Sequence, residues 1–495
     1  MRMPEPDQST LDRRAAIVAA MRRIVPGEGV IDSLDELRAY DCDGLTAYRQ
    51  TPLVVVLPDT TEQVAAVLRW CSAEGVKVVP RGAGTSLSGG ALPLADGVLL
   101  GLGKFKSILE IDPDNRAAVV QPGVTNLAIS EAASGYGLYY APDPSSQIAC
   151  TIGGNVAENS GGVHCLKYGL TTHNLLGIEL VLMSGEIIRI GGKGLERPGY
   201  DLLGLITGSE GLLGVVTEVT VRLLPVPEAV RALLIAFDDV AAAGQCVTDV
   251  IARGIVPAGM EIMDRPAIHA AEAFLEIGYP LDAEALLIIE VDGPEAECAL
   301  LVDEITRIAR NCGATMVQQS TCDEDCERFW AGRKAAFPAI GRISPDYYCV
   351  DGTIPRRCLP EMLRDMREMA RRHGLRVANV FHAGDGNLHP LILYDANREG
   401  EFENAEALGA EILTRCVELG GVLTGEHGVG VEKRDLMPAM FTSVDLDQQQ
   451  RVKCALDPAL LLNPGKMFPT LRRCAELGRE HVHHGQTRFP GLPRF

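Results

Sequence analysis

The chain has 495 residues, of which 46% are hydrophobic and 23% charged, a balance typical of a folded globular protein rather than a disordered or membrane-spanning one. This length exceeds a single ordinary hydrophobic core and predicts two or three domains. The formal net charge of −20 at pH 7, with no tract of Lys and Arg, argues against a nucleic-acid partner.

Residues 1–50 are predicted to form an N-terminal helical segment. Its apolar run, Ala15 to Met21, is broken by charge before it reaches the length of a signal sequence, and no other stretch approaches the length that crosses a bilayer. The 14 cysteines are scattered from Cys42 to Cys474 without a Cys-x₂-Cys pair, which predicts reduced, mostly buried thiols rather than disulfides or an iron–sulfur cluster. Together these features predict a cytoplasmic chain.

Residues 51–227 alternate short β-branched runs with glycine-rich turns, the pattern of strands bounded by turns. A helix is predicted from Thr60 to about Glu74, because hydroxyl residues followed by Glu62 and Gln63 are typical of a helix start. The predicted strands are 53–57, 76–79, 98–100, 117–120, 178–182 and 215–224. The segment therefore predicts an α+β domain.

Three loops of this domain are dense in glycine and small residues. The first, Pro80 to Gly90, directly follows a predicted strand and can turn backbone N–H groups and hydroxyls toward a pyrophosphate. The others run from Pro142 to Gly162 and from Gly208 to Gly214. Their spacing fits neither the Rossmann nor the P-loop motif. One such loop is usually only a turn, whereas three in one domain predict a dinucleotide site.

A second domain, residues 228–470, is predicted after the linker Pro225-Val-Pro227. Strands near 233–237, 259–263 and 286–291 alternate with helices as far as about Asn379, which predicts an antiparallel sheet covered by helices on one side. A final helical stretch ends near Gly465, and residues 471–495 are predicted to form a C-terminal tail.

Two glycine-rich stretches of this domain gather three histidines and a glutamate: His382 to His389, and Thr424-Gly-Glu426-His427-Gly. Imidazole and carboxylate groups are the ligands that Zn²⁺ or Mn²⁺ prefers, and glycines let separate segments converge. The pattern therefore predicts a divalent metal beside a proton-transfer base. The alternative is ordinary loop histidines bonded to their neighbours.

Together, the three glycine-rich loops resemble the FAD-binding domain of the vanillyl-alcohol oxidase/p-cresol methylhydroxylase (PCMH) flavoprotein superfamily, and the two histidine motifs resemble the C-terminal domain of its 2-hydroxy acid dehydrogenase branch. Within that branch the chain is similar to the FAD-linked (D-type) subunits of bacterial glycolate oxidases, and the resemblance runs from about Asp41 onward. The segments that carry this narrower resemblance are 329–338, 344–348, 351–355 and 474–485.

The resemblance implies a two-part PCMH-type FAD-binding domain, an α+β, ferredoxin-like substrate and cap domain, and a C-terminal helical segment. The residues that it assigns to FAD binding are Arg81, Gly82, Ala83, Gly84, Thr85, Ser86, Pro142, Asp143, Gly153, Gly154, Asn159, Gly162, Gly208, Glu210 and Gly211. Some superfamily members attach flavin covalently through a histidine in the first loop. Because no histidine lies between Pro80 and Pro93, and His164 is interpreted as a packed residue, the FAD is predicted to be non-covalent.

The chemistry that the resemblance implies is hydride transfer from C2 of a 2-hydroxy acid to flavin N5. His382, His389 and Glu426 are then predicted to hold the divalent metal, and His427 to take the hydroxyl proton. Arg333 is the predicted clamp for the substrate carboxylate, with Lys334 and Arg342 as alternatives. Asp385 and Asn387 are expected to shape the turn or support the ligands.

The predicted function is thus glycolate oxidation to glyoxylate, with electrons passed to a second flavin-domain-like subunit and an iron–sulfur subunit. Those partners would bring a cytoplasmic chain to the inner face of the membrane. Two alternatives stay open: a D-lactate or D-2-hydroxyglutarate dehydrogenase of the same fold, and a non-catalytic flavin electron-transfer subunit. An ether-lipid type of transferase shares the flavin fold, but the metal motif argues against it.

Overall fold

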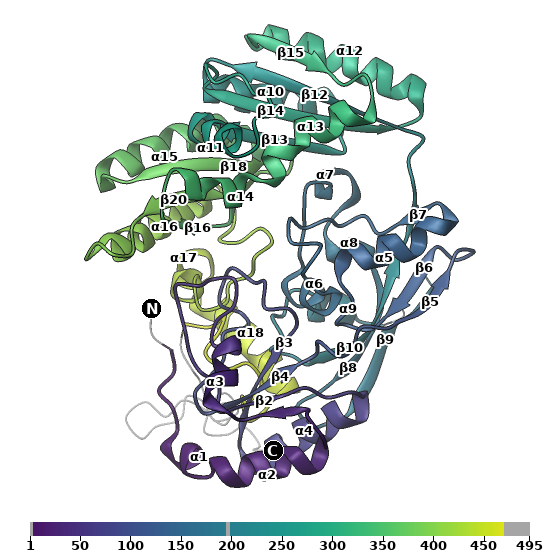
Figure 1. Ribbon diagram of the computed structural model, residues 1–495, viewed down its shortest axis with the longest axis vertical. Coiled ribbons are helices and arrows are strands. Elements are labelled where there is room, and N and C mark those ends of the chain that lie inside the picture. The colour runs from purple at the N-terminus through teal and green to yellow at the C-terminus, as the bar shows by residue number, and fades with distance from the viewer. Residues whose placement is uncertain (1–2, 195–198, 470–495) are drawn as a thin grey trace, which may run out of the picture.

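The computed structural model describes residues 3–194 and 199–469, which form two lobes (Figure 1). The N-terminal lobe extends through residue 225, and the cap lobe begins with the strand that starts at Ala229. The predicted tail, 471–495, lies outside the described residues. Within the described part of the chain, no helix is long and apolar enough to cross a membrane. The free thiols there are mostly buried, as predicted.

The N-terminal lobe contains two main sheets. The first has the order β1-β2-β4-β3, with β2, β4 and β3 parallel and β1 antiparallel. The second is antiparallel, in the order β5-β6-β10-β8-β9, and β7 pairs with β11 beside it. The strands are β1 (Val30–Ile31), β2 (Val54–Val56), β3 (Lys77–Arg81), β4 (Gly97–Gly101), β5 (Ile108–Asp112), β6 (Ala117–Val120), β7 (Leu138–Tyr139), β8 (Leu175–Val181), β9 (Ile187–Gly191), β10 (Val215–Arg222) and β11 (Leu224–Pro225).

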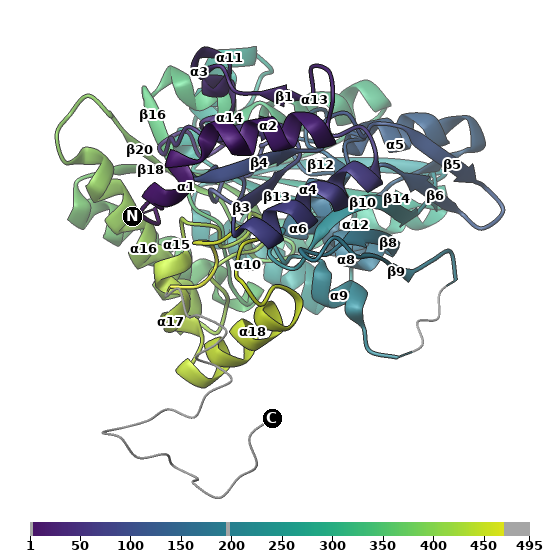
Figure 2. The ribbon, with the colours of Figure 1, turned by 90° about the horizontal axis from the view of Figure 1, so that it is seen from below.

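Most helices of this lobe are short, and two longer ones, α2 and α4, lie side by side in the view from below (Figure 2). Thr60 begins α4 as predicted, since its hydroxyl accepts the backbone N–H of Gln63 at 3.3 Å. The helices are α1 (Gln8–Asp12), α2 (Arg14–Ile24), α3 (Leu34–Leu37), α4 (Thr61–Glu74), α5 (Asn126–Ala133), α6 (Ile152–Glu158), α7 (Cys165–Tyr168), α8 (Thr171–Asn174) and α9 (Leu202–Ile206). The segment 1–50 contributes β1 as well as the predicted helices.

The cap lobe is built on one antiparallel sheet. Its first four strands lie in the order β15-β12-β14-β13, the ferredoxin-like arrangement, and β18, β20 and β16 continue the sheet beyond β13. The strands are β12 (Ala229–Phe237), β13 (Gly259–Asp264), β14 (Ala285–Gly293), β15 (Met316–Gln319), β16 (Asp346–Cys349), β17 (Gly352–Thr353), β18 (Arg376–His382), β19 (Asn387–Leu388) and β20 (Pro390–Tyr394).

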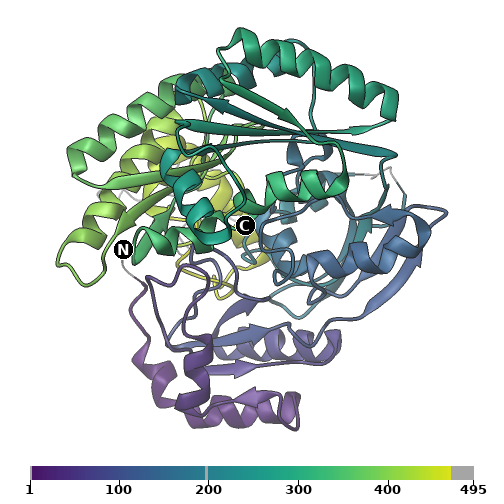
Figure 3. The ribbon, with the colours of Figure 1, turned by 45° about the horizontal axis from the view of Figure 1, so that its top comes forward.

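Helices cover both faces of the cap sheet (Figure 3), so the prediction of helices on one side is wrong. Leu233, Ile235 and Phe237 of β12 belong to the core on the side of α10, α12, α15 and α16, whereas Leu234 and Ala236 belong to the core on the side of α11, α13 and α14. The helices are α10 (Val240–Ala252), α11 (Arg265–Leu275), α12 (Glu295–Asn311), α13 (Asp323–Lys334), α14 (Ala336–Ala339), α15 (Leu359–His373) and α16 (Glu401–Glu418). A strand that is apolar on both faces requires this double cover.

The end of the described chain returns to the N-terminal lobe through α17 (Met437–Met440) and α18 (Ser443–Leu456), as Figure 1 shows in yellow-green and yellow. Leu462 forms a parallel bridge with Val78 on the outer strand β3. The buried Lys453 donates to the backbone carbonyl of Leu212 at 2.5 Å. The last described residues are therefore physically part of the N-terminal lobe.

Candidate active site

A cavity of about 630 Å³ lies where the two lobes meet. One wall comes from the glycine-rich loops of the N-terminal lobe. The other wall is made by residues of the cap and of the segment that follows it: Lys334, Phe337, Pro338, His389, Glu426 and His427. A concave site of this size between two lobes is typical of a cofactor or substrate site.

The structure places most, but not all, of the predicted FAD residues on this cavity. Those that line it are Arg81, Gly82, Ala83, Gly84, Thr85, Ser86, Gly153, Gly154, Glu210 and Gly211. Those that are not among the lining residues are Pro142, Asp143, Asn159, Gly162 and Gly208. Asn159 instead ends helix α6 in the left-handed conformation, and its side chain accepts the backbone N–H of Thr172 at 3.0 Å. Pro144 and Ser145, next to the predicted pair, do line the cavity.

The first two glycine loops approach each other so closely that one position requires glycine. A Cβ atom on Gly82 would lie 2.3 Å from the hydroxyl oxygen of Thr151, which precedes helix α6. The loops can therefore present adjoining backbone to a ligand in the cavity. Arg81 is held beside them, since its guanidinium donates to the carbonyl of Cys42 at 2.7 Å.

The two histidine motifs converge at the cap end of the cavity. His382 and His389, at the end of β18 and just after β19, have ring centroids 4.9 Å apart. Oε1 of Glu426 lies 3.2 Å from Nε2 of His382 and 3.4 Å from Nε2 of His389. The three side chains offer ligand atoms that all lie within 4.8 Å of one another. This is the nitrogen and oxygen donor set that the sequence predicted.

One nitrogen atom of the cluster makes no hydrogen bond within the described protein. The Nε2 atom of His389 is buried and has no hydrogen-bond partner among the described residues. An orphaned buried donor or acceptor is costly, which fits a ligand at this place. The residues present therefore suit a divalent cation.

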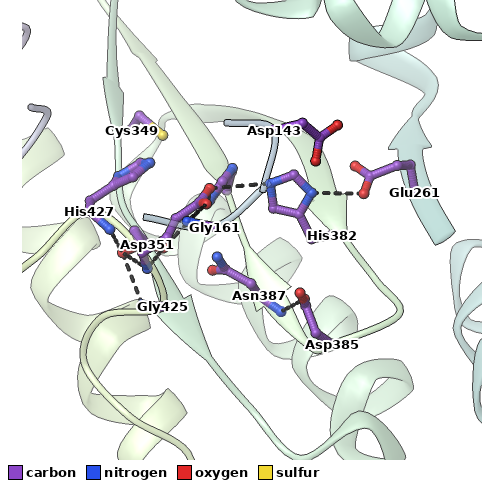
Figure 4. Close-up of polar contacts among 12 residues, drawn as sticks. Asp143, Gly161, Glu261, Cys349, Asp351, His382, Asp385, Asn387, Gly425 and His427 are labelled. Atoms are coloured by element: carbon purple, nitrogen blue, oxygen red, sulfur yellow. Dashed lines mark hydrogen bonds and ion pairs between the residues drawn. The ribbon is translucent and has the colours of Figure 1, made fainter. Parts of the chain in front are cut away.

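Two buried carboxylates that the sequence analysis did not assign hold this cluster (Figure 4). Glu261 on β13 lies beside His382 in the sheet register, and its Oε1 is 2.7 Å from Nδ1 of His382. Asp351 accepts the backbone N–H groups of Gly425 and His427, both at 2.9 Å. Carboxylates of this kind orient imidazole ligands and raise their basicity.

His427 is positioned as a neutral base. Its ring stacks on that of His389 at 4.8 Å, and its Nδ1 atom is buried without a hydrogen-bond partner among the described residues. Burial, which disfavours the charged imidazolium, lowers the pKa of His427 to about 4, although the nearby Asp351 opposes the shift. The imidazole is therefore unprotonated at neutral pH and can accept a proton.

Glu426 connects the cluster to the N-terminal lobe. Burial raises its pKa, but hydrogen bonding and the charge of His382 outweigh that effect and hold the pKa of Glu426 at about 2. Its Oε2 accepts the backbone N–H of Gly161, in the second glycine-rich loop, at 3.1 Å (Figure 4). The carboxylate is thus ionised and touches both lobes.

The three candidate carboxylate clamps occupy different environments. Arg333 is only 2% exposed, is not among the cavity-lining residues, and donates through Nε to Glu261 at 2.7 Å. Its Nη2 atom is buried and has no partner among the described residues. Lys334 lines the cavity, whereas Arg342 lies over the ring of Phe274 at 5.5 Å.

The remaining predicted residues have local roles. His164 lies between Asp143 and Glu290, with ring nitrogens 2.7 and 2.9 Å from their carboxylates, and joins the two lobes outside the cavity. Asp385 accepts the backbone N–H of Asn387 at 3.2 Å and shapes the turn between His382 and His389 (Figure 4).

Residues 52–191 match the family model described as FAD binding domain, and residues 226–467 match FAD linked oxidases, C-terminal domain. The geometry and the family matches together define an FAD-dependent oxidoreductase. The chain belongs to the family of FAD-linked oxidases that includes the glycolate oxidase subunit GlcD. The predicted branch of flavoproteins is confirmed.

Several relatives show how far the similarity extends. The glycolate oxidase subunit GlcD of Escherichia coli strain K12 is 58% identical, over 97% of this chain and 97% of its own length. A D-lactate dehydrogenase of Archaeoglobus fulgidus is 36% identical, over 84% of this chain and 92% of its own length. Among solved structures, p-cresol methylhydroxylase superposes with a TM-score of 0.76 at 18% identity, covering 93% of this chain and 97% of that one, which confirms the PCMH-type fold.

Proposed function

We propose that the chain oxidises glycolate to glyoxylate, with FAD as hydride acceptor. The observation that carries the proposal is that His389, Glu426 and His427 line the cavity of the glycine-rich loops, with His382 directly behind Glu426 at 3.2 Å. A 2-hydroxy acid loses two hydrogens on oxidation, one as hydride and one as a proton, and the cavity offers a place for each to go. The name of the E. coli relative supports glycolate as the substrate.

The reaction removes a hydride and a proton from the substrate, and each needs its own acceptor. The substrate C2–H bond breaks with its electron pair going to the flavin, while the hydroxyl proton passes to His427. FAD supplies hydride acceptance at N5 when bound. Because His427 is neutral and its Nδ1 has no other partner among the described residues, it can take that proton directly.

A divalent metal, Zn²⁺ or Mn²⁺, would be held by His382, His389 and Glu426, and would supply Lewis-acid polarisation of the substrate's hydroxyl and carboxylate oxygens. In this proposal Glu261 orients His382, and the 2.7 Å contact between Oε1 of Glu261 and Nδ1 of His382 supports that role. The buried Nε2 of His389 supports the same site, since it makes no hydrogen bond among the described residues and lies 3.4 Å from carboxylate oxygens of both Asp351 and Glu426.

Arg333 is proposed to bind the substrate carboxylate through its partner-free Nη2. Arg333→Lys should weaken apparent glycolate affinity by roughly 1.5–3 kcal/mol, the cost of a hydrogen bond to a charged group, because a lysine cannot reproduce the guanidinium fork. Steady-state KM and the substrate dependence of flavin reduction measure it. Arg342→Lys is the matched control, since Arg342 lies over Phe274. Parental affinity in the Arg333 variant would transfer the role to Lys334, which lines the cavity.

D-Lactate and D-2-hydroxyglutarate are the alternative substrates, and the Archaeoglobus relative favours keeping D-lactate in view. A diacid needs a second cationic side chain for its second carboxylate. The cationic side chains that line the cavity are Lys334 and Arg81, and Arg81 already donates a hydrogen bond to the carbonyl of Cys42. The deciding experiment is anaerobic bleaching of the flavin by glycolate, both lactates and 2-hydroxyglutarate. Failure of every substrate would favour the non-catalytic electron-transfer alternative, against which the assembled cluster argues.

The FAD is proposed to be non-covalent. His164 is held by Asp143 and Glu290 outside the cavity, and no histidine lies in the first glycine-rich loop. Purified protein should therefore be yellow and should release intact FAD into the supernatant on acid precipitation. Colour that stays in the pellet would show a covalent bond.

Electrons are proposed to leave through a second flavin-domain-like subunit and an iron–sulfur subunit, at the inner face of the membrane. The support is that the E. coli relative is named a subunit. In this proposal the chain itself remains in the cytoplasm and reaches the membrane only through those partners.

A further inference from the structure

The loop that carries Glu426 and His427 is fixed by two carboxylates from different lobes. Asp351 of the cap holds the backbone on the N-terminal side, through Gly425 and His427. Glu210 of the N-terminal lobe holds the other side: its Oε1 accepts Val429 N–H and its Oε2 accepts Gly430 N–H, each at 2.7 Å. His427 thus lies between two anchored stretches of backbone.

Glu210 is itself held firmly. It is 3% exposed and adopts a left-handed backbone conformation, φ 52°, which costs a non-glycine residue roughly 1–3 kcal/mol and persists only when the surroundings enforce it. Its N–H donates to the carbonyl of Ala157 at 2.8 Å, and its own carbonyl accepts the side-chain amide of Asn463 at 2.7 Å. This strained turn places the carboxylate of Glu210 at the surface of the N-terminal lobe, where it contacts the loop that carries His427.

The same loop continues onto the first glycine-rich loop. The backbone N–H groups of Val431 and Glu432 both donate to the carbonyl of Ser88, at 2.9 and 3.0 Å. The loop is therefore attached to the walls of the cavity directly after His427, first at Glu210 and then at Ser88. Ser88 offers only a backbone carbonyl, so Glu210 is the side chain that can be changed to test this attachment.

Both carboxylate oxygens of Glu210 already accept backbone N–H groups of the loop, and a carboxyl group offers a pyrophosphate no suitable donor in this arrangement. We propose that Glu210 is a positioning residue, which fixes His427 relative to the flavin by clamping the backbone of residues 429 and 430. This inference rests on the proposed role of His427 as base. In this role Glu210 keeps the proton acceptor His427 at a fixed position relative to the hydride acceptor, which is bound by the other lobe.

The test is Glu210→Gln, which keeps the size of the side chain but replaces one acceptor oxygen by an NH₂ group that faces a backbone N–H. In anaerobic stopped-flow experiments with glycolate, the limiting rate of flavin reduction per bound flavin should fall by roughly 10–100-fold, the scale of a misplacement of about 1 Å. KM, FAD content and metal content should change little. Glu210→Asp keeps the charge but shortens the reach, and should slow reduction as well.

The matched control is Glu179→Gln. Glu179 is a buried carboxylate of β8 in the same lobe, held by Thr61, Thr217 and Arg189, and has no contact with the loop among the described residues. It should lower the Tm while leaving the reduction rate per bound flavin at the parental value. A structural role alone would make Glu210→Gln behave in the same way.

The outcomes separate this inference from the proposed function. If glycolate reduces the bound flavin of Glu210→Gln and Glu210→Asp at the parental rate, including in preparations that lose part of their FAD, the positioning role of Glu210 is wrong. The proposed role of His427 as the base would stand. If the parent protein is not reduced by any 2-hydroxy acid, or if His427→Asn reacts normally, it is the proposed function that fails.

Discussion

Flavin reduction by glycolate should slow by roughly 10²–10⁴-fold in His427→Asn, the usual contribution of a positioned general base. Asparagine occupies a similar volume and can keep a hydrogen bond, but it cannot take the hydroxyl proton. The backbone anchor of the loop should survive, because Asp351 accepts the backbone N–H of residue 427 rather than its side chain. Anaerobic stopped-flow absorbance measures the reduction rate.

Two further measurements make this result specific. Reoxidation of chemically reduced flavin should hardly change in His427→Asn, since that half-reaction does not involve the substrate hydroxyl. His269→Asn serves as the control, because His269 on α11 is exposed and its ring bonds only to the carbonyl of Leu281 among the described contacts. Near-parental reduction in the His427 variant would mean that the base lies elsewhere.

Loss of the divalent metal with retention of FAD is expected for His389→Ala. In the proposed site the imidazole would supply one of three ligand positions, and removing a ligand should cost more than the roughly 10–100-fold in metal affinity that loss of an outer partner costs. FAD should stay bound, because most of the predicted FAD residues that line the cavity belong to the glycine-rich loops of the other lobe. Metal analysis by mass spectrometry, together with flavin absorbance, gives the ratio of metal to flavin.

His389 is a better choice than His382 for this experiment. His382→Ala would also remove one of the two 2.7 Å partners of the buried Glu261 and leave it only Arg333, which would disturb the buried ion-pair network as well as the metal site. His373→Ala is the control, because His373 ends α15, where its ring contacts Asn404 and Glu411, and it has no contact with the cluster among the described contacts. An unchanged metal ratio in His389→Ala, or a parent protein without metal, would end the metal hypothesis.

Local signals were sufficient for the N-terminal lobe. The β-branched runs predicted β2, β3, β4, β6, β8 and β10, and the hydroxyl residue before Glu62 predicted the start of α4. β5 and β9 were missed because a charged residue, Glu110 in one and Arg189 in the other, interrupts their short isoleucine-rich runs and their residues are largely exposed. Sequence periodicity reports burial, and an edge strand that faces solvent carries little of it.

The histidines of the candidate site could be named from the sequence, but the buried carboxylates that hold them in place could not. Residues that bear chemistry by type, such as His382, His389 and His427, stand out in glycine-rich loops. Glu261 and Asp351 act through distant partners, so their roles depend on which strands become neighbours. A signal was available for Glu261, since an acidic residue inside the apolar strand Gly259–Asp264 must have a buried partner. Nothing local could name His382 as that partner.

The return of the C-terminal segment to the N-terminal lobe has a consequence for biosynthesis. β3 is the outer strand of its sheet, and its free edge is covered by Leu461 to Asn463, through bonds to both the N–H and the carbonyl of Val78. Those residues leave the ribosome long after β3. The cofactor-binding lobe therefore cannot be completed until they have been synthesised, and until then the outer edge of β3 stays uncovered and open to pairing with another strand.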